Sequence, residues 1–109
     1  MGMKPGYDQL LKAEDLLRAR WRNLVMLTLH DRGEPTRFSD LRRAIFEYTD
    51  RHPNDSRLTA ALAQLRTGGI VRKETNTTGH PFWALTEEGV ACAEILEMFL
   101  QMLAERDDP

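Results

Sequence analysis

The sequence predicts a mainly α-helical domain that carries one small antiparallel β ribbon of two or three strands. Two observations lead to this class. Apolar residues recur at helical spacing in several segments of residues 8–69 and again over 86–106, whereas only residues 70–85 show short apolar runs around a polar turn. The chain has 109 residues, so we expect a single domain, 1–109, with one modest hydrophobic core.

The N-terminal part, residues 8–30, contains two predicted helices. The first runs from Asp8 to about Leu17 with leucines on one side, and the second runs roughly from Arg20 to His30. Apolar residues cover more than a narrow stripe of the second helix, so we expect it to be largely buried. A glycine and a proline soon after it, at positions 33 and 35, are typical of a helix end.

Residues 37–69 predict a pair of helices. Ser39 is expected to cap the first helix, with Phe38 packed in front of it as a hydrophobic staple. The apolar residues of this helix face the core at helical spacing, so Arg42 and Arg43 are left outside.

A polar loop, Thr49 to Asp55, is expected to join the two helices because it contains His52-Pro53 among polar residues. Asp55 or Ser56 then caps the second helix, which ends at Gly68-Gly69. The inner side of this helix is marked by apolar residues at spacings of three and four: Leu58, Ala61, Leu62 and Leu65.

The ribbon is predicted over residues 70–85. The first strand starts at Ile70-Val71, the turn covers Asn76 to Pro81, and the return strand is Phe82-Trp83-Ala84-Leu85. Such a small hairpin is not stable alone in water, so its apolar side chains must pack on the helix pair.

The C-terminal helix, residues 86–106, is predicted to begin with Thr86 as its cap. Its apolar residues wrap more than half of the helix surface. Folding of a single small domain cannot bury so wide an apolar surface on one helix. We therefore expect part of it to be buried against another helix, as in a dimer.

The charge is strongly segregated along the chain, although the net charge is only −2. Arg18 to Lys73 contains twelve basic and six acidic residues, a local charge of +6. From Thr86 onward there are seven acids and one base, a local charge of −6. A polyanion responds to the nearest patch of charge as well as to the total, so the basic segment is compatible with a nucleic-acid partner.

Several function classes lack support in the sequence. His30, His52 and His80 are scattered, and no metal-ligand spacing, Gly-rich phosphate loop or nucleophile–base pair is present. We therefore expect no catalytic residues, no metal and no cofactor. No apolar run is long enough to span a membrane, and the N-terminus lacks a signal-peptide pattern, so we expect a cytoplasmic protein without a membrane partner.

The one cysteine, Cys92, fits a reducing compartment and excludes an intrachain disulfide framework. A position on the last helix is compatible with a redox switch between subunits. Acidic neighbours would instead raise the pKa of its thiol, and we favour a small buried apolar side chain.

A helix pair followed by a β hairpin is the winged helix-turn-helix layout, in which the second helix enters the major groove of DNA and the hairpin forms a wing. The chain resembles the HxlR-type branch of these regulators, which is close to the MarR and PadR proteins. The matching segments are RWRNLVMLTLHDRGEPTRFSDLRRAI, LTAALAQLRTGGIVRKE and the aromatic-Ala-LTEEG end of the wing. RFSDLRRAI is the most distinctive of them.

The resemblance implies a homodimeric bacterial transcriptional regulator that binds double-stranded DNA sequence-specifically, with the terminal helices forming the dimer. A small-molecule effector is compatible with it, but no residue set identifies one. The residues that it assigns to DNA fall in three groups. Phosphate contacts are expected from Arg37, Ser39, Arg42 and Arg43; contacts of the second helix from Ser56, Arg57, Thr59, Ala60, Ala63 and Gln64; and contacts of the wing from Lys73, Thr77, Thr78 and His80.

Each of these residues also has a purely structural explanation: helix capping for the serines, solubility for the arginines, and turn geometry for Thr78-Gly79. The alternative function is a winged helix that binds a protein partner without contacting DNA, which the modest net charge, the alanine-rich second helix and the long loop favour. Salt distinguishes the two, because affinity for DNA falls steeply as salt rises.

Overall fold

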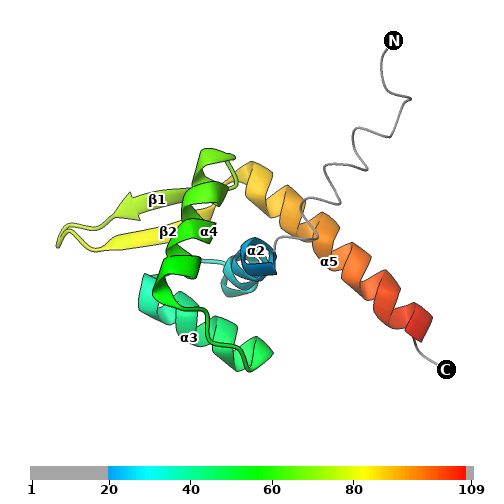
Figure 1. The fold of residues 1–109 in the computed structure, drawn as a ribbon. Coiled ribbons are helices and arrows are strands. Elements are labelled where there is room, and N and C mark those ends of the chain that lie inside the picture. Colours follow the sequence, from blue (N-terminus) through cyan, green and yellow to red (C-terminus); the bar gives the residue numbers. More distant parts are fainter. Residues whose placement is uncertain (1–19, 108–109) are drawn as a thin grey trace, which may run out of the picture.

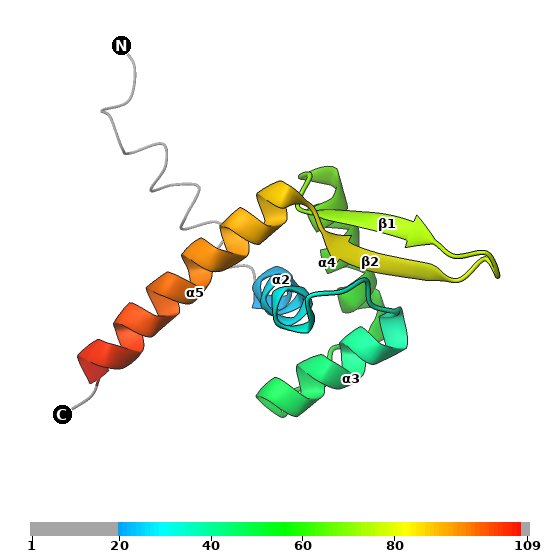
Figure 2. The same ribbon diagram turned by 180° about the vertical axis from the view of Figure 1, so that it is seen from behind.

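The computed structural model describes residues 20–107, so the helix predicted at 8–17 lies outside the described residues. The described residues form four helices and one hairpin: α2 (Arg20–Arg32), α3 (Phe38–Thr49), α4 (Asp55–Thr67), β1 (Val71–Thr75), β2 (Pro81–Leu85) and α5 (Glu87–Asp107). Figure 1 shows α2 near the centre of the molecule. The ribbon formed by the two strands projects beyond α4, and α5 runs along the other side of α2 (Figures 1 and 2).

Helix α2 is largely buried, as predicted, because it contacts α3, α4, α5 and β2. On one side Val25 and Leu29 join a cluster with the inner faces of α3, α4 and β1. On the other side Met26 packs against α5. The buried members of the first cluster are Val25, Leu29, Leu41, Ile45, Leu58, Ala61, Leu62, Leu65 and Val71, and those of the second are Met26, Ala93 and Leu96.

The start of α3 differs from the prediction. The helix begins at Phe38, and the capping position belongs to Arg37, whose side chain makes no capping hydrogen bond. Ser39 therefore lies inside the first turn, where its hydroxyl cannot cap. The prediction was wrong because it placed the serine at the helix boundary, whereas the backbone of Arg37 is the last extended one and its carbonyl accepts from the amide of Leu41 at 2.9 Å.

The connection between α3 and α4 is shorter than predicted. Helix α3 continues to Thr49, and Asp50 ends it in the left-handed conformation with φ of 59°. The cap of α4 is Asn54, so the proposal of Asp55 or Ser56 was wrong by one or two residues. The side chain of Asn54 accepts from the amide of Arg57 at 2.8 Å.

The ribbon has two antiparallel strands, with Val71 opposite Leu85 and Thr75 opposite Pro81. Pro81 was predicted in the turn but begins β2, a position where its missing N–H costs no ladder bond. Thr36 forms an isolated bridge to the outer side of β2, because its N–H and C=O pair with those of Trp83 at 2.8 and 2.9 Å. The hairpin packs on the core through buried Val71 and through Trp83, as predicted.

Helix α5 starts as the sequence predicts. The Thr86 hydroxyl accepts from the amide of Gly89 at 3.0 Å and donates to the carbonyl of Gly69 at 2.6 Å. Only Ala93 and Leu96 of its apolar residues are fully buried on α2. None of the helices in residues 20–107 is both long and apolar enough to cross a membrane. Large apolar side chains remain exposed along the rest of α5: Ile95, Met98, Phe99, Leu100, Met102 and Leu103.

Candidate nucleic-acid interface

The outward face of α4 is the first part of the candidate interface. Leu58, Leu62 and Leu65 are buried on the core, so the opposite side of the helix points away from the molecule. The Ser56 hydroxyl donates to the Asn54 side chain at 3.0 Å, which gives it a local structural role in addition to its exposure. All six predicted residues of this helix are exposed: Ser56, Arg57, Thr59, Ala60, Ala63 and Gln64.

A groove of about 320 Å³ separates α4 from the base of the ribbon. Its α4 wall is formed by Thr59, Leu62, Ala63 and Arg66, its ribbon wall is formed by Lys73 and Trp83, and Phe38 of α3 completes it. The Lys73 ammonium lies over the indole of Trp83, 5.6 Å from the ring centre. Two cations, Arg66 and Lys73, thus face one groove.

Arg66 was missed by the sequence analysis. It follows Thr59 and Ala63 at spacings of seven and three, so it lies on the same side of α4, and this periodicity was a usable signal. It was overlooked because it lies in the last turn, where a basic residue also has a role in stabilising the helix end.

Arg37, just before α3, lies outside the lining of this groove. Its guanidinium is 5.4 Å from the centre of the Phe82 ring, and Phe38, the next residue, packs on Trp83 with ring centres 6.2 Å apart. Because consecutive residues of a strand point to opposite faces, Arg37 lies on the Phe82 face of the ribbon and Lys73 lies on the Trp83 face. Stacking on a ring limits the freedom of a cation without neutralising its charge.

The predicted residues of α3 line a second hollow, of about 390 Å³, with the start of α4. Ser39, Arg42 and Arg43 lie on the α3 side, and Asn54 and Asp55 lie on the α4 side. Arg42 is paired with Asp55 at 2.5 Å, and Arg43 lies 3.7 Å from Asp40. These two arginines remain exposed, but each already has a carboxylate partner.

The predicted residues of the wing are divided between its base and its tip. Lys73 lies at the base, whereas Thr77, Thr78 and His80 lie in the turn. The side chain of Asn76 organises this turn, because it accepts from the amide and hydroxyl of Thr78 at 3.0 and 2.7 Å and from the amide of His80 at 2.9 Å. Thr78 thus has the structural role in the turn that was weighed from the sequence, and all three residues are exposed.

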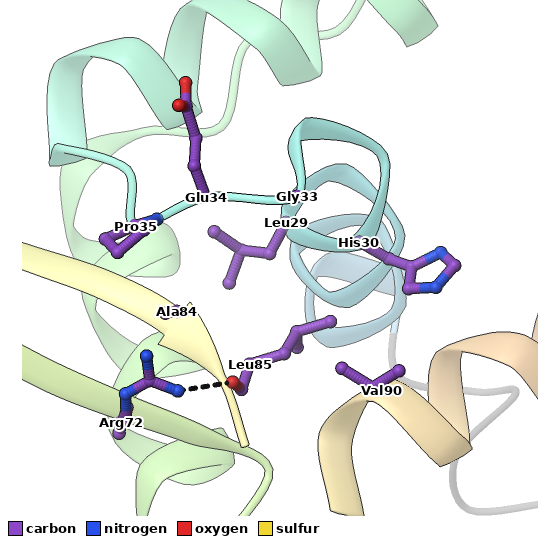
Figure 3. Close-up of a pocket in the computed structure, with 9 residues that line it drawn as sticks. All are labelled: Leu29, His30, Gly33, Glu34, Pro35, Arg72, Ala84, Leu85 and Val90. Carbon is purple, nitrogen blue, oxygen red and sulfur yellow. Dashed lines mark hydrogen bonds between the residues drawn. The ribbon is translucent and has the colours of Figure 1, made fainter. Parts of the chain in front are cut away.

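Arg72 is on the other face of the ribbon from Lys73. Figure 3 shows it in a hollow with Leu29, Pro35 and Val90, where its guanidinium donates to the carbonyl of Leu85 at 2.9 Å. It is also paired with Glu74 at 2.6 Å. Arg72 therefore stabilises the ribbon, and the alternation of side chains along β1 keeps it away from the α4 groove.

Several of the described cations without a carboxylate partner lie on α4, on the strand that faces it or just before α3, while others, such as Arg51 and Arg106, lie elsewhere. Within residues 20–107, no carboxylate lies within ion-pairing distance of Arg37, Arg57, Arg66 or Lys73. Two acids of α5 face α2 instead: the carboxylate of Glu97 lies 3.0 Å from Nδ1 of His30, and that of Glu94 lies 3.9 Å from its Nε2. The segregation of charge in the sequence thus becomes a segregation between two sides of the fold.

The groups with shifted pKa values lie away from this face. A hydrogen bond to Asp31 raises the pKa of Tyr48, which links α3 to α2. Burial, and then the carboxylate of Glu88, raises the pKa of Cys92. No group of three potential metal ligands comes together in the described part of the chain.

Comparison with known proteins bears directly on this geometry. The sequence profile of the HxlR-like helix-turn-helix family matches residues 16–108. No curated protein matched by sequence.

Several solved structures are similar to this chain. The reduced form of the transcriptional regulator YodB from B. subtilis is 26% identical, with a TM-score of 0.70 over 97% of this chain and 95% of that one. A winged-helix DNA-binding protein from STIV is 25% identical, with a TM-score of 0.65 over 72% and 85% of the two chains. A PadR-like transcription factor from Bacteroides fragilis shares the fold at 23% identity, with a TM-score of 0.67 over 87% and 94%.

The fold is therefore a winged helix, with α3 and α4 as the helix-turn-helix and the β1–β2 ribbon as the wing. Family and fold are those of DNA-binding transcriptional regulators rather than of enzymes. The chain belongs to the HxlR-like helix-turn-helix family.

Proposed function

We propose that the protein is a homodimeric transcriptional regulator that binds double-stranded DNA sequence-specifically, with α4 in the major groove. The observation that carries this proposal is the set of cations without carboxylate partners on α4 and on the strand that faces it, Arg57, Arg66 and Lys73, with unpaired Arg37 just before α3. Phosphate contacts supply much of the affinity of such proteins, and cations that are already neutralised contribute less.

Each side of α4 has a place for one DNA strand. On the wing side, Arg66 and Lys73 face the groove that Trp83 closes, so the phosphates of one strand would lie there. On the α3 side, the hollow beside Arg42 and Arg43 would receive phosphates of the other strand. The exposed tip of the wing, with Thr77, Thr78 and His80, would extend along the backbone or into the minor groove.

The homodimer is proposed from α5. Ile95, Met98 and Met102 recur at spacings of three and four, and their side chains are 67%, 64% and 60% exposed. A row of this kind matches the seam of two packed helices, and its exposure in a single chain is costly. Pairing through α5 would leave both α4 faces available, because α4 lies on the other side of α2 (Figure 1).

DNA binding is tested by fluorescence anisotropy of labelled duplex from the gene's own upstream region, against scrambled duplex, over a series of salt concentrations. Lys73→Gln and Arg66→Gln should each lower affinity and reduce the slope of log K against log salt by about 0.9, the value for one phosphate contact. Arg106→Gln removes the same charge from the far end of α5 and should leave both quantities unchanged (Figure 1).

The result that would overturn DNA binding is equally definite. If neither duplex binds at low salt, the winged helix serves a protein partner instead. In that case Lys73→Gln and Arg66→Gln have no effect, and loss of function follows substitution of the apolar face of α5.

The dimer has its own test. Met98→Glu places a charge in the α5 row and should convert the protein to a monomer in sedimentation equilibrium. Gln101→Glu adds the same charge on an exposed position of the same helix and should leave the dimer intact. A wild-type protein that sediments as a monomer at micromolar concentration would contradict the proposal.

A further inference from the structure

The chemistry of the α4 face limits which base pairs it can read. The residues opposite the buried leucines are short, with Ala60 and Ala63 at the centre of the outward side. Long donors are confined to the flanks, with Arg57 and Gln64 on one side and Arg66 in the groove toward the wing. None of the described residues makes a hydrogen bond with the side-chain carboxamide of Gln64 or with the side-chain hydroxyl of Thr59, so both side chains are available to a ligand.

Short side chains at the centre bring the helix backbone close to the floor of the major groove. An alanine methyl has neither donor nor acceptor, so it cannot select among base edges by hydrogen bonding. The one feature of the groove floor that it complements is the 5-methyl group of thymine. Gln64 lies one helical turn after Ala60, and a carboxamide matches the N6 and N7 atoms of adenine with two hydrogen bonds.

Arginine at the centre would favour guanine, but none is there. Arg57 lies in the first turn of α4, three residues after the Asn54 cap. Arg66 faces the wing groove beside Lys73, where we expect it to contact a phosphate rather than a base. The unpaired cations are thus placed to position the helix, while the residues left for base readout are apolar or carry an amide.

From this arrangement we infer that α4 recognises half-sites with A·T pairs at their centre, reading thymine methyl groups with Ala60 and Ala63 and an adenine with Gln64. The inference rests on the proposed DNA-binding function and specifies its ligand. Most of the affinity for DNA then comes from phosphate contacts and from the shape of the duplex. Discrimination between base pairs comes mainly from contacts with thymine methyl groups, and each contact contributes the free energy of burying one methyl group.

The experiment starts with selection of binding sequences by the full-length wild-type protein from a random duplex library. In the enriched site, each thymine is then replaced singly by uracil, which removes the 5-methyl group and leaves base pairing intact. At one or two thymines of each half-site, uracil should weaken binding about fourfold per methyl group. Thymines outside the half-sites should tolerate uracil without effect.

Protein variants assign the methyl contacts. Ala60→Gly should bind the thymine and uracil duplexes equally at one position, and Ala63→Gly should do so at a neighbouring position. Ala104→Gly carries the same loss of helix propensity in α5 and should keep the full discrimination at both. Gln64→Ala should relax the selection for adenine at one position.

The outcomes separate the two levels of the proposal. Failure to enrich any sequence overturns the proposed function itself. Enriched half-sites with G·C centres, or equal binding of every uracil duplex, overturn the readout by methyl groups while DNA binding stands. Discrimination that survives in both Ala60→Gly and Ala63→Gly overturns the assignment to these two residues.

Discussion

At the scale of single residues, Gly89 is a position where the packing leaves no space for a side chain. It lies in the first turn of α5, and a Cβ atom there would overlap the backbone carbonyl oxygen of Ile70 and lie 3.2 Å from a methyl of Leu85. The same carbonyl accepts from the amide of Thr86 at 3.0 Å. The start of α5 is therefore fixed against the junction between α4 and β1.

We predict that Gly89→Ala lowers the free energy of unfolding by about 3 kcal/mol or more, because backbone rather than a flexible side chain must move. Urea unfolding followed by tryptophan fluorescence measures it. Gly79→Ala is the matched control: a Cβ there meets nothing within 4 Å, and only its φ of 85° is unfavourable, which costs about 1 kcal/mol. Equal losses in the two variants would contradict the prediction.

Cys92 provides a prediction on reactivity. Burial, and then the Glu88 carboxylate, raises the pKa of its thiol, so the thiolate forms only at higher pH than in an exposed cysteine. The rate of alkylation by iodoacetamide should therefore rise with pH along a curve whose midpoint exceeds that of the same protein unfolded in urea. Glu88→Gln should move the midpoint down only in part, because burial is the larger cause. A folded midpoint at or below the unfolded one would refute this.

At the scale of elements, the sequence predicted every helix and strand within residues 20–107, and the errors lie at boundaries. Asn54, Asp55 and Ser56 are all good capping residues in succession, so sequence alone does not decide which one caps α4. The extent of α3 depended on tertiary contact: the ring of Phe46 stacks on His52 at 3.8 Å, which holds the connection close to the helix.

The candidate interface was predicted unevenly for a related reason. The outward face of α4 follows from helical periodicity, so its residues were found. Whether an arginine is paired depends on which carboxylates lie near it in the folded chain, and periodicity carries no such information. Arg42 and Arg43 proved to be paired, while Arg66, in the last turn of α4, proved to be unpaired and to face Lys73.

The pair between Arg42 and Asp55 joins α3 to the start of α4, and its removal should change DNA affinity and stability in opposite directions. Asp55→Asn leaves Arg42 able to neutralise a phosphate, so affinity for any duplex should rise and the salt slope should steepen by about 0.9. The same change removes a carboxylate from the first turn of α4, which costs about 0.3–1 kcal/mol of stability.

Salt-dependent anisotropy and thermal unfolding measure the two effects. In the double variant Asp55→Asn/Arg42→Gln the gain in salt slope should disappear. If Asp55→Asn instead weakens binding to the native duplex, the pair serves to fix the angle between α3 and α4.

At the scale of the whole molecule, α2 separates two surfaces of different character. Unpaired cations surround α4 and the wing, whereas α5 carries acids and an exposed apolar row. None of the described acids of α5 forms an ion pair with a cation of α4; Glu94 and Glu97 face His30 of α2 instead. A dimer through α5 would bury the apolar row and present two cationic faces at a fixed distance, so binding of the second half-site becomes intramolecular.

This arrangement predicts a strict dependence on the spacing of half-sites. Two α4 helices in one dimer reach major grooves about one DNA turn apart, so inserting five base pairs rotates one half-site by about half a turn away from its helix. The wild-type protein should then lose about 100-fold in affinity, down to the level of an isolated half-site.

Met98→Glu, as a monomer, should bind the original and the lengthened duplexes equally. Replacing five spacer base pairs without changing their number controls for sequence and should cost little. If the wild type bound both spacings alike, the two half-sites would be occupied independently, and the apolar row of α5 would have another partner.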